Sequence, residues 1–232
     1  MGGSTGGYVI NSLAVAGGTV FAGSSDGPLY AFDAGGCASS TCPPLWTGQV
    51  GAPIYAASPV VANGQVYVAS FDAAPNSFLN VFPAAGCGQP ACRPTWRGTG
   101  GQYLNSSPAI AYGRVYIGLG DGTLRVYPAL GCGRRKCPAS WIGAASGSTA
   151  TIESAPMIAN GVVYVGQNDT RVYAYAARGC DRFRCDALWQ FVTQDPLVNS
   201  SPVMVNGTLY VSGTNVGTVP ELYVFDLVPL PG

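Results

Sequence analysis

The length, composition and charge of the chain exclude several classes of protein. Its 232 residues suffice for one domain with its own core, and only 9% of them are charged, whereas 33 are glycine and 18 proline. This composition favours many short strands and tight turns over helices. No apolar run approaches the roughly 18 residues of a membrane-spanning helix. The formal net charge of zero gives no reason to expect nucleic acid as a partner.

Five segments of the chain repeat one pattern. Each opens on Ser-Leu, Ser-Pro or Ala-Pro, and an apolar run, a glycine-containing turn and an alternating V-Y-V type of segment follow. The second residues of the opening pairs are Leu13, Pro59, Pro108, Pro156 and Pro202, spaced by 46, 49, 48 and 46 residues. That period fits a four-stranded propeller blade of about 40 to 50 residues. The sequence therefore predicts one all-β domain over residues 1–232, with repeats at about 12–57, 58–106, 107–154, 155–200 and 201–227.

Within each repeat the turns delimit the strands. The apolar run and the alternating segment are predicted to form a hairpin with a tight turn. The third strands are predicted at Leu29 to Phe32, Leu79 to Phe82, Leu124 to Tyr127, Val172 to Tyr175 and Leu222 to Phe225. In four repeats a tryptophan opens the fourth strand, and these are Trp46, Trp96, Trp141 and Trp189. A large ring at this fixed place predicts a wedge between adjacent blades.

The eight cysteines form four C-x4-C pairs. The pairs are Cys37 with Cys42, Cys87 with Cys92, Cys132 with Cys137, and Cys180 with Cys185. If each pair closes a β-hairpin, its Cα atoms lie roughly 4.5 to 5.5 Å apart, which a disulfide accepts. Four disulfides indicate an oxidising compartment, so we expect an extracellular, cell-surface or periplasmic protein. Zinc binding by thiolates is the alternative, although structural zinc prefers closer pairs such as C-x2-C.

The start of the chain carries no secretion signal. It opens Met-Gly-Gly-Ser without a charged region or an apolar region. We therefore expect that a signal peptide has been removed or lies outside this sequence.

The repeat S-P-x-x-x-x-G-x-V-Y-V-G-x-x-D-G-x-L-Y-A-F-D-A, followed by a tryptophan strand, resembles the PQQ-like (quinoprotein-type) β-propeller repeat. Leu13 to Ala34 and Pro108 to Ala129 match it best, and recognisable versions cover nearly the whole chain. The added G-C-x4-C signature resembles secreted bacterial members of this family. The resemblance implies a propeller of four-stranded antiparallel blades.

For function the resemblance implies two alternatives. Members that are dehydrogenases have about eight blades, hold PQQ and calcium through a Glu/Asn/Asp set, use an Asp base and often carry adjacent cysteines. This chain differs from them, with five repeats, two glutamates, no Cys-Cys dipeptide and no C-x-x-C-H haem site. Other members are scaffolds that bind partners through their loops. We therefore expect no cofactor, with PQQ or calcium as the alternative.

No catalytic set is recognisable in the sequence. The absence of histidine excludes Ser-His-Asp and Cys-His arrangements and the common histidine metal sites. One recurrent position remains, thirteen residues after the second residue of each opening pair, and it holds Asp26, Asp72, Asp121, Asp169 and Asn215. In a propeller these side chains would form a ring that suits a cation or a sugar. The alternative is turn chemistry, because Asp-Gly favours tight hairpin turns.

Basic residues are concentrated in the middle of the chain. All eleven lie between Arg93 and Arg184. Those in or beside the cysteine pairs are predicted to form a basic rim on one propeller face, and they include Arg93, Arg97, Arg134, Arg135, Lys136, Arg182 and Arg184. The rim would suit an acidic polymer or partner, and a solvated loop surface is the alternative.

The fifth repeat ends after its third strand and lacks both cysteines and tryptophan. A closed five-bladed ring is slightly favoured, and a part of a larger propeller, with open edges that invite self-association, is the alternative. The sequence thus predicts a non-catalytic binding or scaffold propeller that recognises a protein or polysaccharide. A quinoprotein-like enzyme and a structural module of a self-assembling surface polymer are the alternatives.

Overall fold

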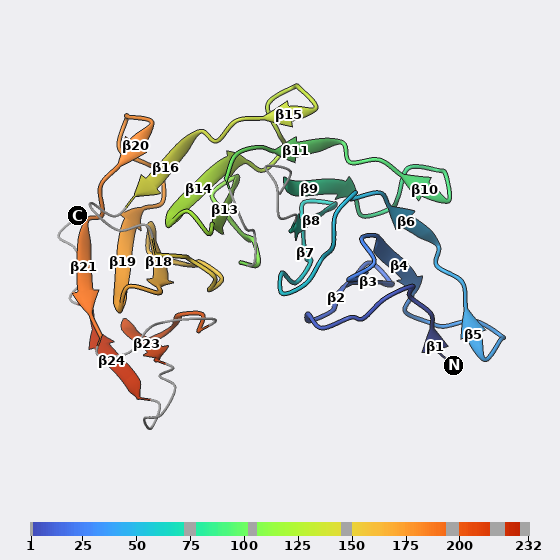
Figure 1. Cartoon of the computed structure of the whole chain (residues 1–232), viewed down its shortest axis with the longest axis horizontal. Coiled ribbons are helices and arrows are strands. Elements are labelled where there is room, and N and C mark those ends of the chain that lie inside the picture. Colours follow the sequence, from blue (N-terminus) through green and yellow to red (C-terminus); the bar gives the residue numbers. More distant parts are fainter. Residues whose placement is uncertain are drawn as a thin grey trace.

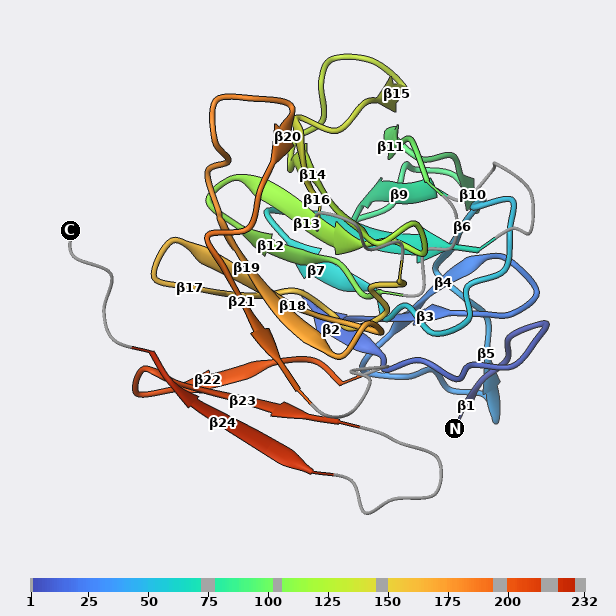
Figure 2. The same ribbon diagram turned by 60° about the vertical axis from the view of Figure 1, so that its left-hand side comes forward.

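The computed structural model describes residues 2–71, 78–101, 106–144, 150–193, 200–213 and 221–227. Within these ranges the regular structure consists of strands without a helix, so no described segment is a helix suited to crossing a membrane. The strands form five sheets, one for each repeat, and one further pair of short strands. We number these sheets as blades 1 to 5 in chain order (Figures 1 and 2). The all-β prediction is therefore confirmed.

Each blade is an antiparallel sheet whose strands follow the order of the chain. The first, innermost strands are β2 (Ala14–Ala16), β7 (Val60–Ala62), β12 (Ala109–Ala111), β17 (Met157–Ala159) and β22 (Val203–Val205). The second strands are β3 (Thr19–Gly23), β8 (Gln65–Ser70), β13 (Arg114–Gly118), β18 (Val162–Gln167) and β23 (Thr208–Ser212). The third strands are β4 (Leu29–Asp33), β9 (Phe78–Pro83), β14 (Thr123–Pro128), β19 (Arg171–Ala176) and β24 (Leu222–Asp226). The fourth, outer strands are β6 (Trp46–Gly48), β11 (Trp96–Gly98), β16 (Trp141–Ala144) and β21 (Trp189–Val192).

Two-residue turns join the first and second strands, as predicted. In blade 2 Asn63 and Gly64 have φ values of 51° and 71°, and in blade 3 Tyr112 and Gly113 have 49° and 67°. Positive φ at both central residues is the geometry of the type I′ turn, whose twist matches that of the flanking strands. Asparagine and glycine adopt it most readily, which explains the Asn-Gly pairs of the repeat.

The four predicted disulfides are present, with Cα separations of 5.6 or 5.7 Å. No cysteine is free, so none remains as a thiolate for zinc. The predicted hairpin, however, is wrong. The second cysteine of each pair ends a two-residue strand, which belongs to the sheet of another blade in three pairs and pairs with β1 (Gly2–Gly3) in the case of Cys42, whereas the first cysteine lies outside any strand. The glycine before each first cysteine has a φ between 77° and 91°, and it turns the chain out of its own blade.

We call residues 37–42, 87–92, 132–137 and 180–185 the cysteine loops. Their strands are β5 (Thr41–Cys42), β10 (Ala91–Cys92), β15 (Lys136–Cys137) and β20 (Arg184–Cys185). β10, β15 and β20 run parallel to the outer strand of the preceding blade, beyond its edge. At the junction of blades 2 and 3, for example, the Arg97 and Thr99 amides donate to the carbonyl oxygens of Arg135 and Cys137 at 2.8 and 2.9 Å. Each of these loops therefore connects its own blade to the preceding one.

The tryptophans pack at the same junctions. Trp46, Trp96 and Trp141 are at most 5% exposed, which confirms the predicted wedge for these three. Trp96 lies 6.4 Å from Tyr127 of blade 3 between ring centroids, and a Cβ on Gly131 would stand 2.9 Å from its indole ring. The buried clusters each combine residues of two neighbouring blades. The core therefore lies between the blades.

The blades follow an open arc, with blade 1 at one end and blade 5 at the other (Figure 1). Blade 5 has three strands, and β24 has β23 as its one neighbour in the described part of the chain. At the other end β1 (Gly2–Gly3) pairs with β5 in the same parallel register that outer strands have with later cysteine loops. The structure thus differs from the closed five-bladed ring that the sequence slightly favoured.

Candidate functional site

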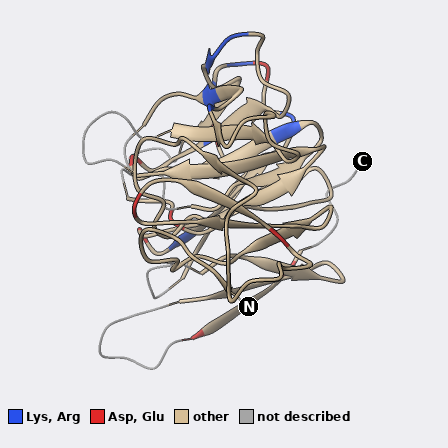
Figure 3. Ribbon diagram, turned by 90° about the vertical axis from the view of Figure 1, so that its right-hand side faces the viewer, with Lys and Arg blue, Asp and Glu red and all other residues tan. Residues whose placement is uncertain are grey.

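The predicted basic residues lie along the outer edge of the arc. Lys136 belongs to β15 and Arg184 to β20, the short strands beyond the outer strands, and Arg97 belongs to β11 itself. Figure 3 shows that lysine and arginine gather over this part of the molecule. The sequence placed them on one propeller face, whereas the parallel pairing of the cysteine loops carries them to the circumference. We call these residues the basic edge, and they are Arg93, Arg97, Arg134, Arg135, Lys136, Arg182 and Arg184.

The basic edge is poorly neutralised. Among the described residues, its one ion pair joins Arg182 to Asp186 at 3.9 Å, and both side chains are exposed. The other ion pairs, Arg125 with Asp121 and Arg171 with Asp169, lie in the blades. Six cations of the basic edge therefore have no carboxylate partner within the described part of the chain.

Four of these cations converge on one hollow, which we call the basic pocket. It has a volume of about 430 Å³ and is lined by Gln49, Gly51, Arg93, Pro94, Arg97, Arg135 and Lys136. The lining thus comes from the ends of the outer strands of blades 1 and 2 and from the cysteine loop of blade 3. No carboxylate is among these lining residues. A pocket with four cations and no anion suits an anionic group of a ligand.

Local contacts fix two of the four cations. The parallel register of β11 and β15 sets Arg97 opposite Lys136, and both cationic groups lie over the Phe78 ring, 5.2 and 5.8 Å from its centroid. Arg97 Nη2 also donates to the carbonyl oxygens of Gln49 and Val50 at 3.2 and 2.8 Å. Burial lowers the pKa of the Arg97 guanidinium from its ordinary value, but a guanidinium keeps its proton at physiological pH.

A second hollow adjoins the basic pocket, and we call it the neutral pocket. Its volume is about 280 Å³, and its lining is Gln65, Thr95, Trp96, Leu130, Gly131, Cys132, Gly133, Arg134 and Arg135. Arg135 lines both pockets, so they lie side by side. Within the described residues, Gln65 Oε1 and Trp96 Nε1 are buried without a hydrogen-bond partner.

The recurrent aspartates bond within their own blades. The carboxylates of Asp26 and Asp169 accept hydrogen bonds from the hydroxyls of Tyr30 and Tyr173 at 2.8 and 2.6 Å. Asp121 forms its ion pair with Arg125 at 2.9 Å. In each case the partner stands four residues later, on the third strand. Burial, together with Asp169, raises the pKa of Tyr173 to about 12.

The predicted ring of ligands is only partly described. Asp72 and Asn215 lie outside the described residues. Those that are described contain no group of three or more carboxylate, cysteine or histidine side chains placed to hold a metal ion. The ring stays a prediction, and its three described members already have partners.

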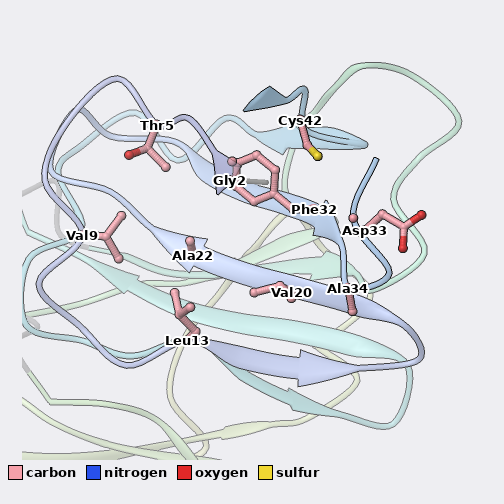
Figure 4. A pocket seen from close by; sticks show the side chains of 12 residues that line it. Gly2, Thr5, Val9, Leu13, Val20, Ala22, Phe32, Asp33, Ala34 and Cys42 are labelled. Atoms are coloured by element: carbon pink, nitrogen blue, oxygen red, sulfur yellow. The ribbon is translucent and has the colours of Figure 1, made fainter. Parts of the chain in front are cut away.

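A third hollow lies at the first blade. It measures about 400 Å³ and is lined mainly by apolar residues, among them Val9, Leu13, Val20 and Phe32 (Figure 4). Gly36 also lines it, and the corresponding glycines of the next three cysteine loops contact the tryptophan of the preceding blade. The apolar hollow thus occupies the side of blade 1 that corresponds to a blade junction.

The reasoning from sequence identified the cations but missed Phe78, Gln49 and Gln65. Phe78 lies one residue before the predicted third strand. The pairing of β9 with β11 within blade 2 brings it beneath Arg97, and the pairing of β11 with β15 between blades brings Lys136 over it. Gln65 carried no signal in the sequence, because its position varies among the repeats, with Thr19, Arg114, Val162 and Thr208 in the others.

Comparisons with known proteins support the fold. Neither a protein-family model nor a curated protein sequence matches the chain. Among solved structures, the computationally designed Ika8 protein is similar with a TM-score of 0.66 and 15% identity over 93% of this chain. BamB from Moraxella catarrhalis is similar with a TM-score of 0.59 and 18% identity over 92% of this chain. The chain spans 57% of the length of each. At these identities the likeness shows the β-propeller fold, and the PQQ-like family remains an interpretation of the repeat.

Proposed function

We propose that the protein is a non-catalytic binding module that recognises an anionic partner, either a protein or a polysaccharide, through the basic edge. The observation that carries this proposal is the basic pocket, where four cations from blades 2 and 3 face one hollow. Cations this close repel one another, and a bound anion turns that repulsion into attraction. Since the chain has no net charge, their concentration on one edge favours a local binding role over general solubility.

The proposal is tested by binding of two polyanions, polygalacturonate and poly-L-glutamate, at several salt concentrations. We expect at least one to bind, with an affinity that falls as salt rises because exposed charges are screened. The triple variant Arg93→Gln, Arg135→Gln and Lys136→Gln is expected to lose most of this affinity. Arg114→Gln, Arg171→Gln and Arg178→Gln remove equal charge outside the basic edge and serve as the control. Binding of neither polymer, or equal losses in both variants, contradicts the proposal.

We further propose that the protein works outside the cytoplasm, as an extracellular, cell-surface or periplasmic component. Four disulfides and no free cysteine support this proposal, because such bonds persist in oxidising compartments. Native mass spectrometry of protein purified from its own source checks it. Eight free thiols in that material would argue for a reducing compartment.

The absence of catalysis and of a cofactor is part of the same proposal. It is supported by the lack of histidine and by the bonds that engage Asp26, Asp121 and Asp169 within their blades. Incubation with PQQ and calcium tests it through the melting temperature. A saturable rise that the double variant Asp121→Ala and Asp169→Ala abolishes would favour a quinoprotein-like activity instead.

The apolar hollow favours a second candidate function, that of a structural module that assembles with copies of itself. Val15 and Leu13 at blade 1 are 67% and 55% exposed, and Leu222 and Val224 on β24 are 64% and 53% exposed. Contact between these two ends would bury both apolar surfaces. Light scattering over a range of concentrations decides, because assembly predicts growth in mass and a constant monomer contradicts it.

A further inference from the structure

The junction of blades 2 and 3 combines two kinds of binding surface. Arg135 lines both the basic pocket and the neutral pocket, so the two pockets adjoin. The basic pocket provides four cations, whereas the neutral pocket adds the uncharged polar groups of Gln65, Thr95 and Trp96 beside Arg134 and Arg135. A ligand with an anionic group next to a neutral polar group therefore finds partners for both groups across the two pockets.

The polar atoms of the neutral pocket indicate what that neutral group is. Trp96 is 4% exposed, and its Nε1 has no acceptor among the described residues. Gln65 Oε1 is likewise buried, without a donor there. An unpaired donor and an unpaired acceptor in one pocket are unusual, because buried polar groups in native proteins nearly always have partners. A hydroxyl suits either atom, since it can accept a hydrogen bond from an indole N–H and donate one to an amide oxygen.

The residue that lies beside the indole nitrogen of Trp96 has no side chain. Gly131 lines the neutral pocket, and a Cβ at this position would stand 3.1 Å from Trp96 Nε1. With no side chain on Gly131, only backbone atoms at that position lie against the indole nitrogen.

The combination of these two atoms is particular to this junction. Trp141 also has a buried Nε1 without a described partner, but the residue at the repeat position of Gln65 is there Arg114, which has no acceptor atom. At the first junction the corresponding residue is Thr19, and Trp46 is not among the tryptophans with an unpaired nitrogen. The donor and acceptor pair thus lies at the same junction as the four cations of the basic pocket.

We propose that this junction binds an acidic polysaccharide, with the anionic group of a sugar unit in the basic pocket and a neighbouring hydroxyl in the neutral pocket. This inference rests on the proposed function, because it names the class of anionic partner. Acidic sugars carry carboxylates or sulfates beside ring hydroxyls in every unit. An acidic peptide offers carboxylate side chains, which only accept hydrogen bonds, and its donors are backbone N–H groups, whereas an acidic sugar places hydroxyls that both donate and accept next to its anionic group.

The experiment compares oligogalacturonate with poly-L-glutamate of the same number of carboxylates, at one salt concentration. Trp96→Phe keeps the ring and removes the N–H, and Gln65→Leu removes the acceptor while keeping a side chain of similar size. Trp141→Phe is the matched control, because Trp141 is equally buried and also has an unpaired Nε1. Thermal melts confirm that each variant is folded.

We expect Trp96→Phe and Gln65→Leu each to weaken oligogalacturonate binding about five-fold, the loss that corresponds to one hydrogen bond of about 1 kcal/mol. Their affinity for poly-L-glutamate is expected to stay unchanged, as is oligogalacturonate binding by Trp141→Phe. In a two-dimensional NMR spectrum, assigned through the phenylalanine variants, the Trp96 indole N–H resonance is expected to shift with oligogalacturonate alone.

Two results would overturn the inference while the proposed function stands. One is unchanged oligogalacturonate binding by both variants with a stationary Trp96 resonance, and the other is an equal loss for both polymers. Binding of neither polymer by the unmodified protein would instead overturn the proposed function itself.

Discussion

The junction of blades 2 and 3 and the junction of blades 4 and 5 differ by one cysteine loop. At the former, β15 covers the edge of β11, and Trp96 is 4% exposed. At the latter, β21 has β19 as its one strand neighbour in the described residues, and Phe191 and Val192 are 46% and 59% exposed. The loop that follows the third strand of one blade thus completes the preceding blade. Each blade of this fold depends on its successor for a covered outer edge.

The sharpest test of this difference removes the tryptophans. Trp96→Ala is expected to lower the free energy of unfolding by about 3 to 5 kcal/mol, because it leaves a cavity in a buried cluster of two blades. Trp189→Ala is expected to cost less than half as much, since its partly exposed ring already contacts water. Urea unfolding of both variants gives the comparison. Equal losses of unfolding free energy would show that the cysteine loop does not shield the tryptophan from water.

A second test concerns the glycines that accommodate the tryptophans. Gly131 has a φ of 80°, and a Cβ there would stand 2.9 Å from two atoms of the Trp96 ring. Gly133 has a φ of 76°, but a Cβ there would meet nothing within 4 Å. Both substitutions to alanine carry the left-handed strain of about 1 to 2 kcal/mol, and Gly131→Ala adds about 1 to 3 kcal/mol of overpacking. Similar urea midpoints for the two variants would mean that the loop moves freely away from the tryptophan.

The disulfides provide a third comparison. The double variants Cys132→Ser with Cys137→Ser and Cys37→Ser with Cys42→Ser open loops of equal length, so chain entropy predicts about 2 kcal/mol for each. The first pair also holds β15 against blade 2, whereas β5 pairs with the two residues of β1. We expect the first variant to be the less stable in urea. Equal stabilities would mean that each disulfide stabilises the protein through chain entropy alone and has no role at the junction.

Much of the fold follows from local patterns that repeat. The Asn-Gly turns, the alternating second strands and the fixed places of the tryptophans each depend on neighbouring residues, and the structure confirms them. The pairing of β15 with β11 joins residues about 40 positions apart through one short ladder of two residue pairs. No side-chain pattern marks a strand of two residues. The disulfides were therefore predicted correctly, whereas the hairpin that was expected to bring the cysteines together does not form.

In the candidate site, too, some features could be predicted from the sequence and others could not. The cations were predictable as a cluster in the sequence, because arginine and lysine concentrate beside the cysteines. Their convergence on one pocket depends on Arg97 lying opposite Lys136 and on the Phe78 ring beneath both. These contacts combine the pairing of β9 with β11 within blade 2 and that of β11 with β15 between blades, so they require the three-dimensional arrangement that the repeat alone does not specify.

The smallest expected difference between the two junctions is in how much stability the protein loses at alkaline pH. Burial raises the pKa of Tyr127 to about 12, and its hydroxyl lies 2.9 Å from the carbonyl oxygen of Thr99. An unfolded tyrosine has a pKa near 10, so above that pH the unfolded chain releases a proton that the folded chain keeps. Its contribution to stability is therefore complete below about pH 10 and is lost as the pH rises toward 12.

At pH 11 this loss amounts to about 1 kcal/mol for one tyrosine. Tyr127→Phe removes the titrating group, so the drop in urea midpoint between pH 9 and pH 11 is expected to be smaller in this variant than in the unmodified protein. Burial also raises the pKa of Tyr164, which contacts Trp189 at the less covered junction, and there the same substitution is expected to change the drop less. If the urea midpoint of Tyr127→Phe drops as much as that of the unmodified protein, Tyr127 ionises while the blades stay together. The junction of blades 2 and 3 would then admit water around Tyr127, despite the loop that covers its edge.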